Sequence, residues 1–400
     1  MKRALKFIRK DKINIAFILL FSLVLFPRNL KSIVIVLFAL ILITKAIINK
    51  HTFNWKFFLI NSSVYIFILL TVFYSEDMRY AGLKLQTMLS LLLFPLLFSL
   101  ISVDDYKSIY QKKDKFLYTY ILSVLGFNIS IFLWYCIKYA NVFDVIQHYL
   151  IIVDQKLGKF NLHPIYVSMH IGMALIFCFY LFMRKRNKWI LLFIPLLLFF
   201  LSILLKKGPI ISLIVVLFYV TVFILNKKTR VKVVLLSLTG FVFVFTSPKL
   251  RSNFKELLNI TPLTENNLTS TNIRAEIYKS SIKPMWESLF SGYGVGDFNT
   301  VLRNSYKNEI LKKKEYNAHN QYISFMLIGG ILLLLLFLGV NFYNINLAVK
   351  QQNYLFVIIS VFYLVNMMTE SILERENGVI FFSFFICFFG LKNYIINHEG

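Results

Sequence analysis

The sequence predicts an all-α integral membrane protein of about twelve transmembrane helices with one large loop. Of its 400 residues, 58% are hydrophobic and 16% are charged, and its mean hydropathy is +0.67. Soluble domains are roughly 45–50% apolar and about 25% charged, so this chain has more apolar surface than a soluble core can bury. A soluble enzyme is excluded, and the 42 Phe and 22 Tyr exclude a disordered chain.

Apolar runs long enough to cross a bilayer recur along the chain. A transmembrane helix needs about 20 mainly apolar residues, because the hydrocarbon core is about 30 Å thick. The first run follows a basic stretch, but no small-residue cleavage pattern follows Pro27 and Arg28, so it is expected to be a retained anchor. The expected spans are residues 13–27, 30–48, 55–74, 83–101, 116–137, 162–183, 189–205, 209–225, 231–247, 320–341, 354–370 and 378–395.

The basic residues indicate the orientation of these spans. The net charge is +25, from 44 Lys and Arg against 19 Asp and Glu. If the N-terminus is cytoplasmic, the basic clusters at 2–12, 107–115, 184–188 and 227–232 all face the cytoplasm, as the positive-inside rule requires. Both termini are therefore predicted to be cytoplasmic, and the charge is interpreted as an orientation signal that does not indicate a nucleic-acid partner.

One connection is far longer than the roughly 2–8 residues usual between packed helices. The predicted domains are membrane helices over 1–247, an outer loop over 248–318 and membrane helices over 319–400. Within the loop, apolar residues at near-helical spacing predict an amphipathic helix, broken at Pro284, on or re-entering the outer membrane surface. These residues are Ile273, Ile277, Met285, Trp286, Leu289 and Phe290. A short charged helix is expected at about 304–315.

His319 is the first candidate for catalysis, because it opens the tenth span, where a titratable ring meets the outer edge of the bilayer. An imidazole there can accept a proton near neutral pH; the competing interpretation is an interfacial ring that caps the helix. Lys206 and Lys207 lie in a tight connection between two apolar runs on the same side. Two adjacent ammonium groups favour an anion site, and the competing interpretation is snorkelling to lipid headgroups.

The loop helix supplies a third candidate. Arg274 offers the donor fork that matches phosphate oxygens, and Tyr278 is expected on the same face. A headgroup contact or a surface ion pair of Arg274 with Glu276 or Glu287 is the ordinary alternative. His163 opens the sixth span and is a weaker candidate, because an interfacial ring without a catalytic role is the simpler interpretation.

Other polar groups have structural interpretations. The run Gly292–Gly296 lacks dinucleotide-binding spacing and is expected to be a turn between two loop helices. Glu370, Glu374, Arg375 and Glu376 are expected to form a solvated or ion-paired turn, with Glu370 the deepest. Asp104 and Asp105 are expected to cap a helix. Three isolated cysteines, Cys136, Cys178 and Cys387, suggest neither a disulfide framework nor a metal site.

Three stretches resemble the O-antigen ligase and polymerase superfamily of bacterial inner-membrane glycosyltransferases. They are the Leu-Leu-Lys-Lys-Gly-Pro segment at 204–209, the loop from Arg274 through the glycine run to Phe298, and Ala318–Tyr322 running into Gly329 and Gly330. The resemblance covers about residues 160–390. It implies a multispanning fold of the GT-C type, located in the inner membrane, with a large periplasmic loop before a late span.

The resemblance also implies a chemistry. Its donor is a glycan on undecaprenyl pyrophosphate, and its acceptor is a hydroxyl of lipid A core or of a second glycan. The essential arginine falls on Arg274, the histidine on His319, and a further cation on Lys207 or, with a poorer match, Lys206. Lysine replaces the arginine of the usual Ser-Arg-Gly pattern, so a bidentate contact becomes a point charge. The implied mechanism is inverting, uses no metal or cofactor, and has His319 as the general base.

Two alternatives remain open. A polymerase would use the same donor and extend one lipid-linked glycan with another. A polysaccharide transporter or flippase also fits twelve spans and a basic external loop, although transporters usually place ionisable residues near the membrane midplane, whereas here they cluster at the outer interface.

Overall fold

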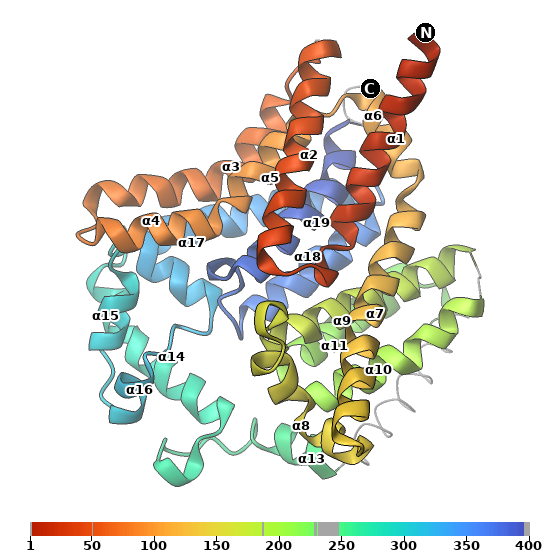
Figure 1. Cartoon of the computed structure of the whole chain (residues 1–400). Coiled ribbons are helices and arrows are strands. Elements are labelled where there is room, and N and C mark those ends of the chain that lie inside the picture. The colour runs from red at the N-terminus through yellow and green to blue at the C-terminus, as the bar shows by residue number, and fades with distance from the viewer. Residues whose placement is uncertain (1, 50, 186–187, 228–229, 231–247, 396–400) are drawn as a thin grey trace. The chain divides into compact units, whose positions relative to one another are not determined.

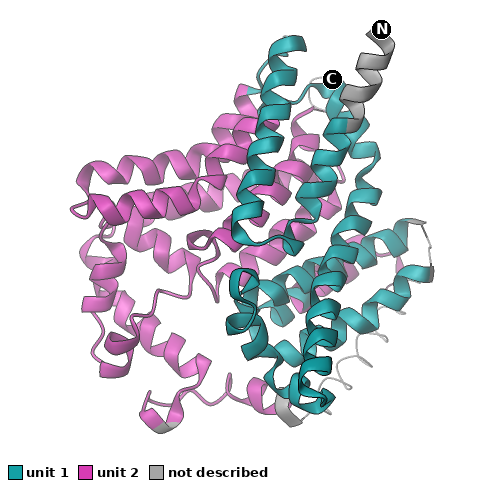
Figure 2. Ribbon diagram, viewed as in Figure 1, with its two compact units in different colours: residues 1–54, 99–213 teal, residues 55–98, 214–400 magenta. Residues whose placement is uncertain are grey.

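The computed structural model describes residues 2–49, 51–185, 188–227, 230 and 248–395, and all the regular elements in these ranges are helices (Figure 1). The all-helical class is therefore confirmed. The expected span at 231–247 lies outside the described residues. The chain forms two compact units, residues 1–54 with 99–213 and residues 55–98 with 214–400 (Figure 2).

Seven of the described helices are long and apolar enough to cross a membrane. The expected span at 83–101 is instead a helix pair bent by 41° between Met88 and Ser90. The apolar helices at Lys12–Phe21, Trp189–Leu204 and Tyr354–Met367 have only 10–17 residues, and at 1.5 Å per residue they are shorter than the hydrocarbon core. The protein is thus a multi-pass membrane protein, but the count of twelve spans is not confirmed.

The first unit packs its helices through aromatic side chains. The ring of Phe17 lies 5.2 Å from that of Phe38 and 5.7 Å from that of Phe116, and all three side chains are buried. An ion pair of 2.8 Å between Arg184 and Asp114 joins two of these helices. The unit contains α1 (Lys2–Phe21), α2 (Arg28–Asn49), α6 (Val103–Gln111), α7 (Lys113–Tyr139), α8 (Val142–Gln155), α9 (Pro164–Lys185), α10 (Phe193–Leu204) and the start of α11 (Lys207–Tyr219).

The helix cap expected at Asp104 and Asp105 is provided by a neighbouring residue at the start of α6. Ser102 is the N-cap, and its hydroxyl accepts from the Asp105 N–H at 3.2 Å while donating to the Asp105 carboxylate at 2.8 Å. Lys45 also contacts this carboxylate, at 2.6 Å. Asp105 therefore supports the Ser102 cap and pairs with Lys45.

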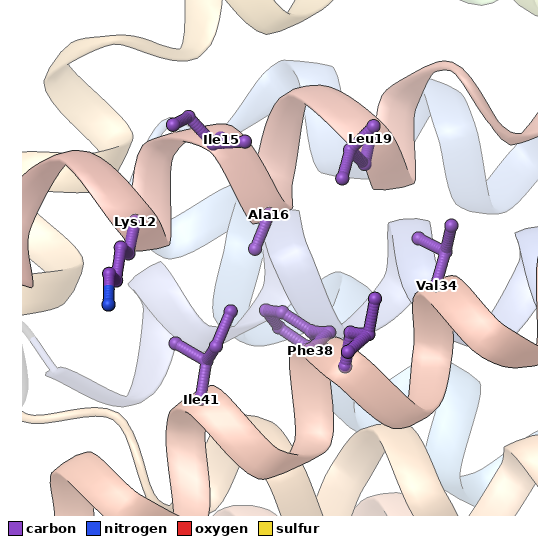
Figure 3. A pocket seen from close by; sticks show the side chains of 8 residues that line it. Lys12, Ile15, Ala16, Leu19, Val34, Phe38 and Ile41 are labelled. Atoms are coloured by element: carbon purple, nitrogen blue, oxygen red, sulfur yellow. The ribbon is translucent and has the colours of Figure 1, made fainter.

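A groove between α1 and α2 is lined by apolar side chains, with Lys12 at one end (Figure 3). Ile15 and Ala16 face it from α1, and Val34 and Phe38 from α2. Because Lys12 is the one ionisable group of its lining, this groove lacks the paired groups that acid–base chemistry needs.

The second unit is built on α17 and α19. Residues 376–395 of α19 are almost entirely buried, and α17 contacts α3, α14, α15, α18 and α19. Figure 1 shows the loop helices α14, α15 and α16 close to one another. The unit contains α3 (Trp55–Leu70), α4 (Met78–Met88), α5 (Ser90–Ser99), the end of α11, α13 (Pro248–Lys255), α14 (Ser270–Glu287), α15 (Phe298–Asn304), α16 (Glu309–Lys314), α17 (Gln321–Lys350), α18 (Tyr354–Met367) and α19 (Glu376–Ile395).

Two expectations for the loop are corrected. Pro284 does not break the amphipathic helix, because it lies in the last turn of α14, where the lost N–H removes a single hydrogen bond and the helix ends three residues later. The charged helix expected at 304–315 is shorter, because α15 ends at Asn304 and α16 begins only at Glu309. The turn between them is closed by a hydrogen bond from the Tyr306 N–H to the Arg303 carbonyl.

Candidate active site

The loop helix α14 carries two of the predicted site residues toward the turn at 368–370. It begins at the N-cap Thr269, whose side chain accepts from the Asn272 N–H. Its buried residues Ile277, Ser281 and Pro284 recur at three- and four-residue spacing and so define the packed face of the helix, which contacts α17.

Arg274 is anchored to that turn by its side chain. Its Nε donates to the Thr369 carbonyl at 3.0 Å, and one terminal nitrogen lies 3.4 Å from the Ser270 carbonyl oxygen. A hydrogen bond through Nε fixes the plane of the guanidinium and leaves its outer edge able to meet an anion. Arg274 thus contacts the Thr369 carbonyl and not Glu276 or Glu287, the ion-pair partners suggested by the sequence. Glu287 pairs with Lys283.

Tyr278 joins two loops through its hydroxyl. The oxygen lies 2.9 Å from the Met368 carbonyl and 3.1 Å from the His319 carbonyl. Burial raises the pKa of Tyr278, although the nearby Arg274 charge works against this rise. The hydroxyl therefore keeps its proton and acts as a donor that holds the His319 loop beside the turn at 368–370.

His319 lies just before α17 in an uncommon backbone conformation. Its φ is +45°, in the left-handed region that side-chain-bearing residues seldom adopt. The conformation is supported on both sides, since the His319 N–H donates to the Asn317 side chain and Asn320 caps α17 by accepting from Tyr322 and Ile323.

The ring of His319 contacts a buried acid. Its Nδ1 lies 3.3 Å from the Oε2 of Glu370, a residue that is 5% exposed. With its proton on Nδ1 donated to this carboxylate, the ring presents Nε2 as a proton acceptor. Histidine bases in other enzymes are oriented by a carboxylate in the same way.

The turn that carries Glu370 is fixed by several side chains. The Leu373 N–H donates to the Gln321 side chain at 2.8 Å, and the hydroxyls of Ser324 and Ser371 lie 3.1 Å apart. Glu370 and Glu374 are buried against His319 and Lys84, so the ion-paired alternative expected from the sequence is the one that the structure shows.

Lys84 is a residue of this region that sequence analysis missed. Its Nζ donates to Glu374 at 3.0 Å and lies over the rings of Tyr80 and Phe298. The sequence did contain a signal for it: Lys84 lies inside the apolar run expected at 83–101, and an ionisable residue in a membrane segment needs a partner.

The glycine run is a structural turn, as expected. Gly292 and Gly294 have φ of +63° and +84°. The Tyr293 and Gly294 N–H groups donate to the carbonyls of Leu327 and Ile328 at 2.7 and 2.9 Å. A Cβ on Gly292 would lie 2.6 Å from the Gly329 nitrogen, so this close approach of backbones requires glycine.

The remaining predicted site residues belong to the first unit. Leu205 ends α10 in the left-handed conformation, Lys206 follows in the turn, and Lys207 opens α11, where the positive end of the helix dipole adds to its charge. His163 is exposed just before α9, with its ring 6.3 Å from that of Tyr166. The structure thus brings Arg274, Tyr278 and His319 together within one unit, and it shows Lys206, Lys207 and His163 in the other.

The described residues contain no group of three or more His, Cys, Asp or Glu side chains placed to hold a metal ion. Cys136, Cys178 and Cys387 are free thiols.

The helices and the site define the class of the protein: a multi-pass membrane protein with a polar, partly buried site where a loop helix meets a membrane helix. Residues 194–338 match the family described as O-Antigen ligase, and this match supports a relationship of this part of the chain to the O-antigen ligase and polymerase superfamily, whose members are glycosyltransferase-like enzymes. The match contains Lys206, Lys207, Arg274, Tyr278 and His319 and ends before Glu370. None of the curated proteins compared with the chain matches it.

Proposed function

We propose that the protein is a bacterial inner-membrane glycosyltransferase that moves a glycan from undecaprenyl pyrophosphate to an acceptor hydroxyl, with lipid A core as the acceptor. The observation that carries the proposal is the contact between His319 and the buried Glu370, beside Arg274 and Tyr278. It is supported by the match of residues 194–338 to O-Antigen ligase. Both termini are assigned to the cytoplasm, and residues 248–318 to the periplasm.

His319 acts as the general base. Its Nε2 takes the proton of the acceptor hydroxyl as that oxygen attacks the anomeric carbon, and Glu370 stabilises the imidazolium that forms. The glycosidic oxygen of the diphosphate leaves from the opposite side, so the configuration inverts in a single displacement. No carboxylate nucleophile is needed, which agrees with a site whose buried acid is directed at a histidine.

Cationic side chains stabilise the departing diphosphate. Arg274, oriented by Thr369, supplies a guanidinium. The family resemblance adds Lys207, with Lys206 beside it, whose ammonium groups belong to the start of α11 in the other unit. Fixed positive charge at the position where negative charge develops lowers the barrier without reorganisation during the reaction. His163 is proposed as a further substrate-binding residue.

Transfer by the purified protein in vesicles tests this function. The donor is a synthetic undecaprenyl-pyrophosphate glycan, offered with lipid A core or with a second lipid-linked glycan, with and without a chelator. We expect transfer to lipid A core that survives the chelator and falls about 10²–10⁴-fold in His319→Ala. His148→Ala, which removes an exposed histidine of α8, is the matched control and should retain activity.

The acceptor separates the ligase from the polymerase. Product formed only on the second lipid-linked glycan identifies the polymerase alternative with the same catalytic residues. If His319→Ala transfers at the wild-type rate to either acceptor, the proposed mechanism is wrong.

A further inference from the structure

The exposed side of α14 carries large apolar side chains. Ile282 and Trp286 are one helical turn apart and are 50% and 70% exposed, and Phe290, in the turn that follows, is 69% exposed. They lie roughly opposite the buried Ile277 and Pro284, given 3.6 residues per turn. We name Ile282, Trp286 and Phe290 the apolar stripe.

The end of the stripe is fixed to a membrane helix. The Ile331 N–H donates to the Leu289 carbonyl at 2.7 Å. A Cβ on Gly330, which has φ of +63°, would collide with the backbone of Phe290. Phe290 therefore has a defined place along α17, at the kink formed by Gly329 and Gly330.

The kink divides α17, a candidate membrane span as a whole, into a short first part and residues 331–350. These residues rise roughly 30 Å at 1.5 Å per residue, which is enough to cross the hydrocarbon core. None of residues 321–330 is exposed, whereas Leu332 and Leu335, directly after the kink, are 52% and 57% exposed. The apolar surface of α17 that faces outward thus begins where the stripe ends.

The charges beside the stripe complement a lipid surface. Lys279 is exposed and the Lys283 side chain is 84% exposed, and on the helix both positions flank Ile282 and Trp286 on the side away from Arg274 and Tyr278. Lysines beside an apolar stripe reach lipid phosphates while the apolar side chains enter the acyl region, and tryptophan favours this interface.

We propose that the apolar stripe of α14 inserts into the bilayer leaflet beside the α17 kink, with membrane phospholipid as its partner. The loop helix is then a membrane-surface anchor, which holds Arg274 and Tyr278 at the depth of the lipid phosphates. The insertion is independent of the proposed transfer reaction, although a lipid-linked diphosphate donor would meet Arg274 at that depth.

Spin-label accessibility in vesicles of zwitterionic and anionic phospholipid tests the anchor. Labels are attached at Ile282→Cys, Trp286→Cys, Lys283→Cys and Lys313→Cys in the full chain, with Cys136, Cys178 and Cys387 replaced by alanine and thermal unfolding checked for each variant. Relaxation by oxygen, which concentrates in hydrocarbon, is compared with relaxation by a water-soluble nickel complex.

We expect oxygen to dominate at positions 282 and 286, and nickel to dominate at 283 and at 313, which lies on the solvated helix α16. Strong nickel relaxation at 282 and 286 would place the stripe in water and overturn the proposal. Weak relaxation by both agents would show that protein covers the stripe, which also overturns it. Neither measurement depends on catalysis, so a failure of the anchor is distinguishable from a failure of the proposed function.

Discussion

Glu370 determines which nitrogen of His319 is able to act. Its carboxylate faces Nδ1 at 3.3 Å, so in the proposed mechanism Nε2 is the nitrogen that meets the acceptor. A carboxylate in this place selects the ring tautomer and stabilises the cation, two effects that a neutral amide of the same size does not reproduce.

Glu370→Gln should therefore reduce kcat while leaving KM for the lipid-linked donor nearly unchanged. We expect a loss within the roughly 10²–10⁴-fold range of general-base catalysis, measured by the transfer assay in vesicles. Glu309→Gln, which changes an exposed acid of α16, is the control. An unchanged kcat in Glu370→Gln would mean that the contact does not orient the base.

Tyr278 positions His319 and Glu370 through the backbone. Its hydroxyl bridges the loops that carry His319 and Glu370, and Tyr278→Phe removes this bridge while keeping the ring. We expect about 1 kcal/mol less stability by thermal unfolding, together with a fall in kcat. Tyr343→Phe, near the opposite end of α17, is the comparison; equal activity of the two variants would exclude a positioning role for Tyr278.

Among the elements, α17 depends on the break at Gly329 and Gly330. The break lets the backbone of residues 289–294 approach α17 closely enough to form hydrogen bonds to Leu327, Ile328 and Ile331. The glycine turn before α15 and the kink of α17 are thus two halves of one backbone contact, which fixes the end of α14.

Gly330→Ala and Gly339→Ala form a matched pair within α17. At Gly330 the φ of +63° and ψ of −160° form a conformation adopted essentially by glycine alone, which disfavours any side chain by about 1–3 kcal/mol, and the Cβ would also collide with Phe290. At Gly339 nothing lies within 4 Å of the added Cβ, so alanine should be neutral or stabilise the helix by up to about 1 kcal/mol. Thermal unfolding in detergent compares the two, and similar melting temperatures would contradict the role of the kink.

At the scale of the whole molecule, the positive-inside pattern predicts on which side of the membrane each connection lies. Lys112 belongs to a basic cluster assigned to the cytoplasm, and Lys313 belongs to the loop assigned to the periplasm. Both side chains are exposed, and the native Cys178 and Cys387 are buried and so add little background.

A membrane-impermeant maleimide should modify Lys313→Cys in cells whose inner membrane is intact, once the reagent has access to the periplasm. Lys112→Cys should react only after the inner membrane is permeabilised. The opposite pattern would invert the topology and place the candidate site on the cytoplasmic side, away from a periplasmic acceptor.

Local properties of the sequence determined the class of the protein and most of its candidate residues. Hydropathy over about 20 residues identifies a membrane helix, so the all-helical, multi-pass architecture followed from composition and spacing. Short motifs pointed to Arg274 and His319. The glycine run was correctly interpreted as a turn, because its spacing does not match a dinucleotide-binding motif.

The tertiary structure alone decided the partners of these residues. His319 contacts an acid 51 residues away, and Lys84 pairs with an acid 290 residues away. No local period encodes such pairs, because they form only when separate helices pack. The same packing buries Glu370 and Glu374 against His319 and Lys84, which decides between the solvated and the ion-paired turn that the sequence left open. It also turns the apolar stripe of α14 away from the core.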